Sequence, residues 1–122
     1  MAHNEGFLKL VNDAKARVKE INIDQYRQLA QSGQPHTLVD VREESEWAAG
    51  HAKGAIHLGK GVIERDIESK IPDHSTKLVL YCGGGFRSAL AADNLQKMGY
   101  VDVISLDGGW KALQSSGLPV EK

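Results

Sequence analysis

Short apolar segments alternate with helical segments along this chain of 122 residues, and this alternation limits the possible folds more than any other feature. The apolar segments have the length and aliphatic content of buried strands; they lie at 37–41, 55–58, 77–81 and 101–106. Segments with helical patterns precede, separate and follow them. Strands that alternate with helices favour the α/β class, with a mainly parallel sheet flanked by helices.

Local signals predict where several helices begin and end. Apolar residues at helical spacing predict an amphipathic helix over 5–20. Asp24 has the character of an N-cap for the next helix, which we expect to end at Gly33. Pro72 and Gly99 are expected to end the two longer helices that precede them.

Composition excludes several classes of function. The chain has the length of one domain and carries 15 Lys and Arg against 16 Asp and Glu, interspersed, so the basic patch of a nucleic-acid-binding protein is missing. Cys82 is the only cysteine, which rules out an internal disulfide or a zinc site of several thiolates, and we expect neither metal nor cofactor. The first residues do not resemble a signal peptide and no apolar run approaches a membrane span, so we expect a cytoplasmic protein without a membrane partner.

Cys82 stands where the clearest strand meets a glycine-rich turn, the end of a parallel sheet at which ligands bind. Three successive glycines let backbone N–H groups turn inward around an anion, which could be the thiolate, its persulfide or an oxyanion substrate. Arg87 adds a fixed positive charge, and we expect Ser88 to cap the helix that follows. The candidate binding residues are Gly83, Gly84, Gly85, Phe86, Arg87 and Ser88.

A lone cysteine is more often a buried, inert side chain than a nucleophile. The direct succession of strand, cysteine, three glycines, arginine, serine and helix is far more specific. Because a helix start and a nearby cation lower the pKa of a thiol, we interpret Cys82 as a reactive cysteine.

Three segments resemble the signatures of the rhodanese-homology domain family. The loop YCGGGFRSALAA at 81–92 is similar to the family's active-site segment. DVREESEWAAGHAKGAIHL at 40–58 and LDGGWKALQSSGLPV at 106–120 are similar to its upstream and C-terminal signatures. The resemblance covers about residues 21–120, with the segments in the family's order.

The resemblance implies a rhodanese-like three-layer sandwich with a five-stranded sheet, a rhodanese domain over 21–122 and a helical extension over 1–20. It implies a sulfurtransferase in which catalytic Cys82 takes sulfane sulfur from thiosulfate or another persulfide donor and passes it to cyanide or a thiol. The expected partners are these small molecules, with a protein sulfur acceptor as a further one and no nucleic acid.

Two residue assignments have alternatives. Asp40 and Arg42 share one face of a strand, and the resemblance favours a supporting ion pair over an acid–base role. Arg87 either binds the anionic donor or points outward and buttresses the loop against a carboxylate.

His51 is expected to be a hydrogen-bonded turn residue, and His3 to be solvated surface.

Three other functions are alternatives to a thiosulfate sulfurtransferase. Mercaptopyruvate sulfurtransferases resemble the loop but carry Ser or Thr in place of Gly84 and a second Arg where this chain has Glu46. Phosphatases that share the fold need five residues between Cys and Arg, and only four, 83–86, lie there. A persulfide carrier that delivers sulfur to a partner protein is the non-enzymatic alternative.

Overall fold

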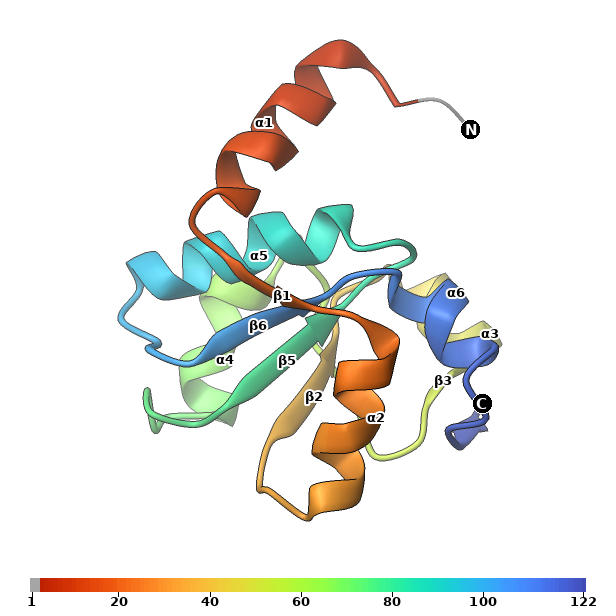
Figure 1. Ribbon diagram of the computed structural model, residues 1–122. Helices are drawn as coiled ribbons and strands as arrows, with labels where there is room; N and C mark the ends of the chain where they lie inside the picture. Colours follow the sequence, from red (N-terminus) through yellow and green to blue (C-terminus); the bar gives the residue numbers. More distant parts are fainter. Residues whose placement is uncertain (1–2) are drawn as a thin grey trace.

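A five-stranded parallel sheet forms the centre of the computed structural model, which describes residues 3–122 (Figure 1). Its strands are β1 (Lys19–Ile21), β2 (Thr37–Asp40), β4 (Ile56–His57), β5 (Leu78–Tyr81) and β6 (Val103–Leu106). They lie in the order β1-β6-β5-β2-β4, and each neighbouring pair is parallel. The predicted α/β class and mainly parallel sheet are therefore confirmed.

Helices cover both faces of this sheet. The helices are α1 (Glu5–Lys15), α2 (Ile23–Ser32), α3 (Glu44–Ala49), α4 (Ile63–Lys70), α5 (Phe86–Lys97) and α6 (Gly109–Gln114). Residues of α4 and α5 build the core on one face, and residues of α2 and α6 build the core on the other. None of the helices in residues 3–122 combines the length and the apolar character that crossing a membrane requires.

The central strand β5 explains why Cys82 faces one particular layer. Leu78 and Leu80 pack into the core beneath α4 and α5, whereas Val79 and Tyr81 pack into the core beneath α2 and α6. Successive side chains of a strand point to opposite faces, so Cys82, directly after β5, continues the row of Leu78 and Leu80. The thiol therefore points toward the α5 side of the sheet.

Two expected helix boundaries were wrong. The first helix ends at Lys15 instead of residue 20, because the chain turns at residues 16–18 and β1 begins at Lys19. Val18 and Ile21 belong to the cores on opposite faces of the sheet. Their spacing of three also fits one face of a helix, so the apolar pattern alone did not reveal where the helix ends. The second helix is capped by Asn22 instead of Asp24, since Asn22 and Gln25 exchange hydrogen bonds in a capping box. The predicted end at Gly33 is confirmed.

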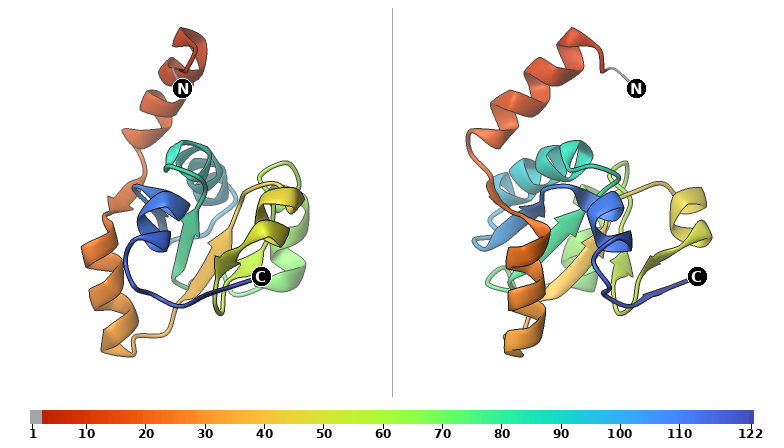
Figure 2. Two further views of the ribbon diagram at one scale, coloured as in Figure 1. Left: turned by 90° about the vertical axis from the view of Figure 1, so that its right-hand side faces the viewer. Right: turned by 45° about the vertical axis from the view of Figure 1, so that its right-hand side comes forward.

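A short antiparallel pair near the C-terminus was not expected. It joins β3 (His51–Ala52) to β7 (Val120–Glu121). Each strand has only two residues, which is too short for a periodic pattern to reveal. The pair places the end of the chain beside the segment that follows α3 (Figure 2).

Helix α1 lies against α5, on the side of α5 that faces away from the sheet (Figures 1 and 2). Val11 and Ala14 are buried in this contact together with Leu90 of α5. Arg17, just beyond α1, donates hydrogen bonds from Nε and Nη2 to the Asp93 carboxylate of α5, at 3.0 and 2.7 Å. The N-terminal helix is thus attached to the helix that follows the Cys82 loop.

Candidate active site

The loop after β5 turns at one glycine in a conformation that other residues rarely adopt. Gly85 has φ +108° and serves as the N-cap of α5, which begins at Phe86. The expectation that Ser88 caps this helix was wrong, because the left-handed turn at Gly85 lets helical geometry begin earlier. Ser88 is instead a fully buried residue of the first helical turn, with its hydroxyl directed toward Cys82.

The Cys82 sulfur is buried and surrounded by donors. The Gly85 N–H donates to Sγ at 3.1 Å, and Ser88 Oγ lies 3.5 Å from Sγ. Burial raises the pKa of this thiol, but the Ser88 hydroxyl and the N–H groups of Ser88, Gly85 and Gly84 outweigh it, so the pKa of Cys82 lies below its ordinary value. The arrangement stabilises a thiolate.

Ser105 is a site residue that the sequence did not reveal. Its Oγ lies 2.8 Å from Ser88 Oγ, and both side chains are completely buried. Ser105 belongs to β6, so the parallel pairing of β6 with β5 brings it beside the loop. A serine inside an otherwise apolar strand was the available signal, since buried hydroxyls require partners.

The N-terminus of α6 holds the loop backbone in place. The Trp110 N–H donates to the Cys82 carbonyl at 2.7 Å, and the Lys111 N–H donates to the Gly83 carbonyl at 3.2 Å. Gly109, with φ +49°, makes this approach possible, since a Cβ there would collide with the Cys82 carbonyl oxygen. Gly109 thus allows the N-terminus of α6 to hold the Cys82 loop through backbone contacts.

Arg87 points to a carboxylate from another part of the chain. Its Nη1 and Nη2 donate to the two oxygens of Glu46 in α3, at 2.8 and 3.1 Å. This pairing lowers the pKa of Glu46 to about 2 and raises the pKa of Arg87. The contact is the one expected if Arg87 buttresses the loop, and it gives a role to Glu46, which the sequence identified only as a departure from the mercaptopyruvate enzymes.

Asp40 and Arg42 form a buried ion pair. Arg42 Nη2 donates to Asp40 Oδ2 at 2.8 Å, and its Nε lies 3.1 Å from both carboxylate oxygens. The same Nη2 donates to the Gly50 carbonyl, and the guanidinium lies 4.6 Å from the centre of the Trp110 ring. These contacts tie the end of β2 to the segments around it, as a supporting pair would.

The surroundings of His51 and His3 can be compared with those predicted from the sequence. His51 is buried, its Nδ1 lies 2.9 Å from the Trp47 carbonyl oxygen and its ring stacks on Trp47, so the expected hydrogen bonding is confirmed, but the residue lies in β3 and not in a turn. His3 is exposed as predicted, but its ring lies 4.7 Å from the ring of Phe86, beside the Cys82 loop. The sequence contained no signal for that contact.

A cleft of about 930 Å³ opens above Cys82. Three parts of the chain line it: the loop, α6 with the residues beside it, and the N-terminal segment. The lining residues are Cys82, Gly83, Gly84, Phe86, Arg87, Gly108, Lys111, Ala112, Ser115, His3 and Phe7. Among the candidate binding residues, Gly85 and Ser88 are buried beneath it and contact the sulfur instead.

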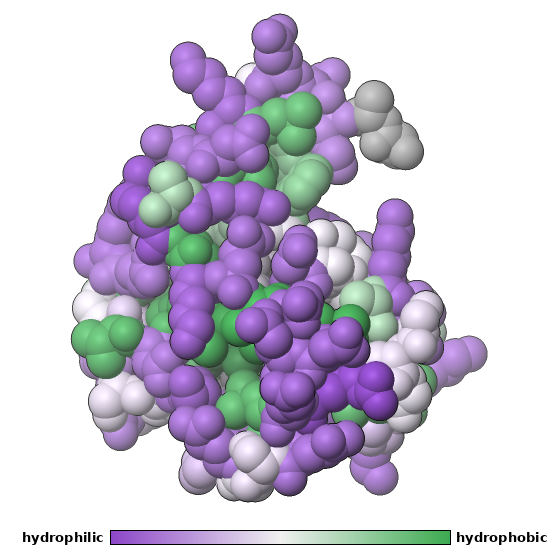
Figure 3. Space-filling model, viewed as in Figure 1, coloured by the Kyte–Doolittle hydropathy of each residue, from purple (hydrophilic) through white to green (hydrophobic). Residues whose placement is uncertain are grey.

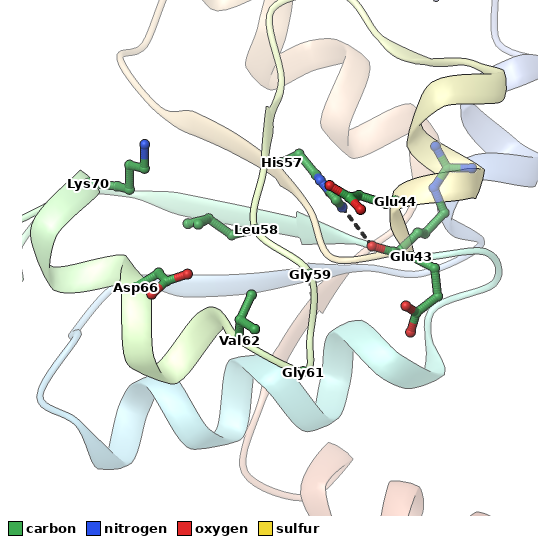
Figure 4. Close-up of a pocket in the computed structure, with 10 residues that line it drawn as sticks. Glu43, Glu44, His57, Leu58, Gly59, Gly61, Val62, Asp66 and Lys70 are labelled. Carbon is green, nitrogen blue, oxygen red and sulfur yellow. Dashed lines mark hydrogen bonds between the residues drawn. The ribbon is translucent and has the colours of Figure 1, made fainter.

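A second hollow, of about 430 Å³, lies beside α4 and contains no thiol (Figure 4). His57 Nε2 lies 2.7 Å from the Arg42 carbonyl oxygen there, and Glu43, Asp66 and Lys70 lie around the hollow. No three His, Cys, Asp or Glu side chains within residues 3–122 are grouped so that they could hold a metal ion. Of these two hollows, the one above Cys82 contains a thiol with a lowered pKa.

The model of the rhodanese-like domain matches residues 22–116. The chain belongs to the rhodanese-like domain family. The matched range includes the loop at Cys82, the Asp40–Arg42 pair and the glycines before Trp110. The family suggested by the three sequence signatures is therefore confirmed.

Two curated relatives and one solved structure indicate how far the similarity extends. Thiosulfate sulfurtransferase GlpE of Vibrio cholerae is 30% identical over 83% of this chain and 92% of its own length. YrkF of Bacillus subtilis, named as a candidate sulfur carrier protein, is 27% identical over 77% of this chain, which spans about half (50%) of that relative. RPA3614 of Rhodopseudomonas palustris, a protein of unknown function described as a possible tyrosine phosphatase, is 27% identical with a TM-score of 0.83, over 99% of this chain and 98% of that one.

Proposed function

We propose that this protein is a sulfurtransferase that carries sulfane sulfur as a persulfide on Cys82. The observation behind the proposal is the thiol at the floor of the cleft, with a lowered pKa, the Gly85 N–H directed at its sulfur and the Ser88 hydroxyl 3.5 Å from it. A persulfide anion has the same charge as the thiolate, so the same donors suit both forms.

The reaction needs no general base. The Cys82 thiolate attacks the sulfane sulfur of a donor such as thiosulfate, the S–S bond of the donor breaks, and sulfite leaves with the electron pair. Cyanide or an acceptor thiolate then attacks the outer sulfur of the persulfide, and the Cys82 thiolate leaves. Each half-reaction conserves charge and moves no proton, so the reaction does not require His51, which is engaged with the Trp47 carbonyl oxygen.

Family membership and the relatives support sulfur transfer in general. Thiosulfate as the donor and cyanide as the acceptor are part of our proposal. GlpE is named for transfer from thiosulfate. The name of YrkF supports the alternative in which the domain hands sulfur to a protein partner. Both readings use the same persulfide on Cys82, and they differ in the acceptor.

The resemblance to RPA3614 raises phosphate chemistry as a second candidate. Only four residues, Gly83 to Phe86, separate Cys82 from Arg87, and the Arg87 side chain is paired with Glu46. A transferring phosphoryl group needs donors around its non-bridging oxygens, and misplaced donors forfeit most of that stabilisation. The short loop and the engaged guanidinium therefore favour sulfur over phosphorus as the attacked atom.

Parallel assays test the proposal against this rival. The parent protein should form thiocyanate from thiosulfate and cyanide with ping-pong kinetics, and should not hydrolyse aryl phosphates at the same pH. Cys82→Ser should abolish thiocyanate formation. Hydrolysis of an aryl phosphate through Cys82 as fast as sulfur transfer would refute the assignment.

A further inference from the structure

The N-terminal helix contributes a wall to the cleft above Cys82. Phe7 of α1 and His3, just before it, line the cleft opposite Lys111 and Ala112 of α6. These N-terminal residues lie outside the matched range of 22–116, so they are not part of the common domain. The space-filling view shows a notch between α1 and the body of the molecule (Figure 3).

An aromatic cluster attaches this wall to the loop itself. The ring centres of Phe7 and Phe86 are 6.2 Å apart, and that of His3 lies 5.4 Å from Phe7 and 4.7 Å from Phe86. Lys15 Nζ lies 5.0 Å from the centre of the Phe86 ring. Phe86 directly follows Gly85, the donor to the Cys82 sulfur, so α1 contacts the loop next to its reacting atom.

The cleft is too large and too apolar for an inorganic substrate alone. Its volume of about 930 Å³ lies in the range of about 300–1,000 Å³ found for sites that enclose organic ligands. Thiosulfate and cyanide are small polar anions that offer no apolar surface to the sides of Phe7 and Phe86 that line the cleft. An apolar group placed there would be removed from water together with the two rings.

The charges at the rim fit an anion. Lys111 is exposed on α6 and brings a cation to the cleft, whereas the charge of Arg87 is engaged by Glu46. A molecule that matches this cleft has an anionic, sulfur-bearing end that reaches Cys82 and an apolar body that contacts α1.

We propose that α1 is a specificity element, and that its Phe7 and the loop residue Phe86 select a sulfane-sulfur donor with an apolar organic body over inorganic thiosulfate. This inference rests on the proposed sulfur transfer through Cys82 and adds the class of donor. The probe for this class is benzenethiosulfonate. The Cys82 thiolate attacks its terminal sulfur, the S–S bond breaks, and benzenesulfinate leaves with the electron pair while the persulfide forms.

A pair of matched donors isolates the contribution of the apolar body. Benzenethiosulfonate and methanethiosulfonate share the reacting group and differ in the group attached to it. The quantity to measure is the ratio of their kcat/KM values, with thiocyanate as the product in both cases. Phe7→Ala should lower this ratio by about tenfold, because the aromatic body loses an apolar contact surface. Leu10→Ala, which alters an exposed residue (56%) of the same helix outside the cleft, should leave the ratio at the parental value.

Further measurements separate a specific effect from a loss of structure. Phe7→Leu keeps an apolar side chain against Phe86 and should give an intermediate ratio, and thermal unfolding of each variant reports whether the fold is retained. If thiosulfate, benzenethiosulfonate and methanethiosulfonate all fail to place sulfur on Cys82, the proposed function itself is wrong. If thiosulfate reacts but the ratio is the same in the parent, Phe7→Ala and Phe7→Leu, the role of α1 in donor choice is overturned while the sulfurtransferase assignment stands.

Discussion

At the scale of single residues, the site depends on a competition at one sulfur atom. Burial opposes a charge on Cys82, while the Ser88 hydroxyl and neighbouring N–H groups favour it. The hydroxyl is itself held by Ser105, which is completely buried. The reactivity of the Cys82 thiol should therefore depend on Ser105, a buried residue that does not line the cleft.

We expect Ser88→Ala to raise the apparent pKa of Cys82 by about one to two units, since a hydrogen bond to a charged group contributes about 1.5–3 kcal/mol. The rate of alkylation of Cys82 by iodoacetamide, measured against pH, reports this pKa. In the parent, the midpoint should lie below that of the same protein unfolded in denaturant. Ser69→Ala, at an exposed serine of α4, is the control. An unchanged midpoint in Ser88→Ala would show that the hydroxyl does not stabilise the thiolate.

The pair of Glu46 and Arg87 links α3 to the loop, and its contribution to stability should depend on pH. The pKa of Glu46 is lowered in the folded protein to about 2, from about 4.3 in an unfolded chain. The folded state therefore favours the ionised form, so the contribution is complete above pH 4.3 and is lost as pH falls through 2.

Glu46→Gln should lower the free energy of unfolding at neutral pH by about 0.5–1 kcal/mol, because the pair is partly exposed to solvent. The difference from the parent should shrink steadily as the pH is lowered below 4.3. Denaturant unfolding at a series of pH values measures it, and Glu44→Gln, at an exposed residue of the same helix, is the control. A difference that stays constant down to pH 2.5 would contradict the assigned ion pair.

At the scale of elements, α6 positions the loop by backbone contact instead of side-chain packing. Gly109 allows the first turn of α6 to approach the Cys82 carbonyl, and the N–H groups of Trp110 and Lys111 complete the contact. Gly109 of the C-terminal signature is thus a requirement of this close approach.

Gly109→Ala should destabilise the protein by more than about 2 kcal/mol, since it adds both a collision with the loop and a side chain in a left-handed conformation. It should also slow alkylation of Cys82, because the loop must shift. Gly117→Ala tests the conformational cost alone, as Gly117 has φ +85° and open space around it. Equal effects of the two substitutions on stability would mean that the close approach to Cys82 has no energetic consequence.

The bounds of these elements show what hydrophobic periodicity could and could not predict. The apolar runs at 37–41 and 77–81 identified β2 and β5 to within a residue, because burial dictates their side chains. Pro72 predicted the end of α4 to within two residues. The end of α1 was misplaced because Val18 and Ile21 have the spacing of a helix face, whereas they pack into the cores on opposite faces of the sheet. The cap at Asn22 was missed because Asp24, two residues later, has the same capping chemistry.

At the scale of the whole molecule, the loop at Cys82 could be identified from the sequence because its parts are contiguous. Its partners could not, because each comes from a distant segment: Ser105 from β6, Glu46 from α3 and Phe7 from α1. These contacts depend on how the layers pack, and a local pattern carries no information about them. The wall that α1 adds to the cleft belongs to this class.

The central claim is that Cys82 carries the transferred sulfur. It is tested most directly by intact-mass measurement after incubation with thiosulfate. The parent protein should gain the mass of one sulfur atom, cyanide should remove that mass with release of thiocyanate, and Cys82→Ser should gain none. A parent protein that gains no mass while producing thiocyanate, or a Cys82→Ser protein that produces thiocyanate at the parental rate, would contradict the account.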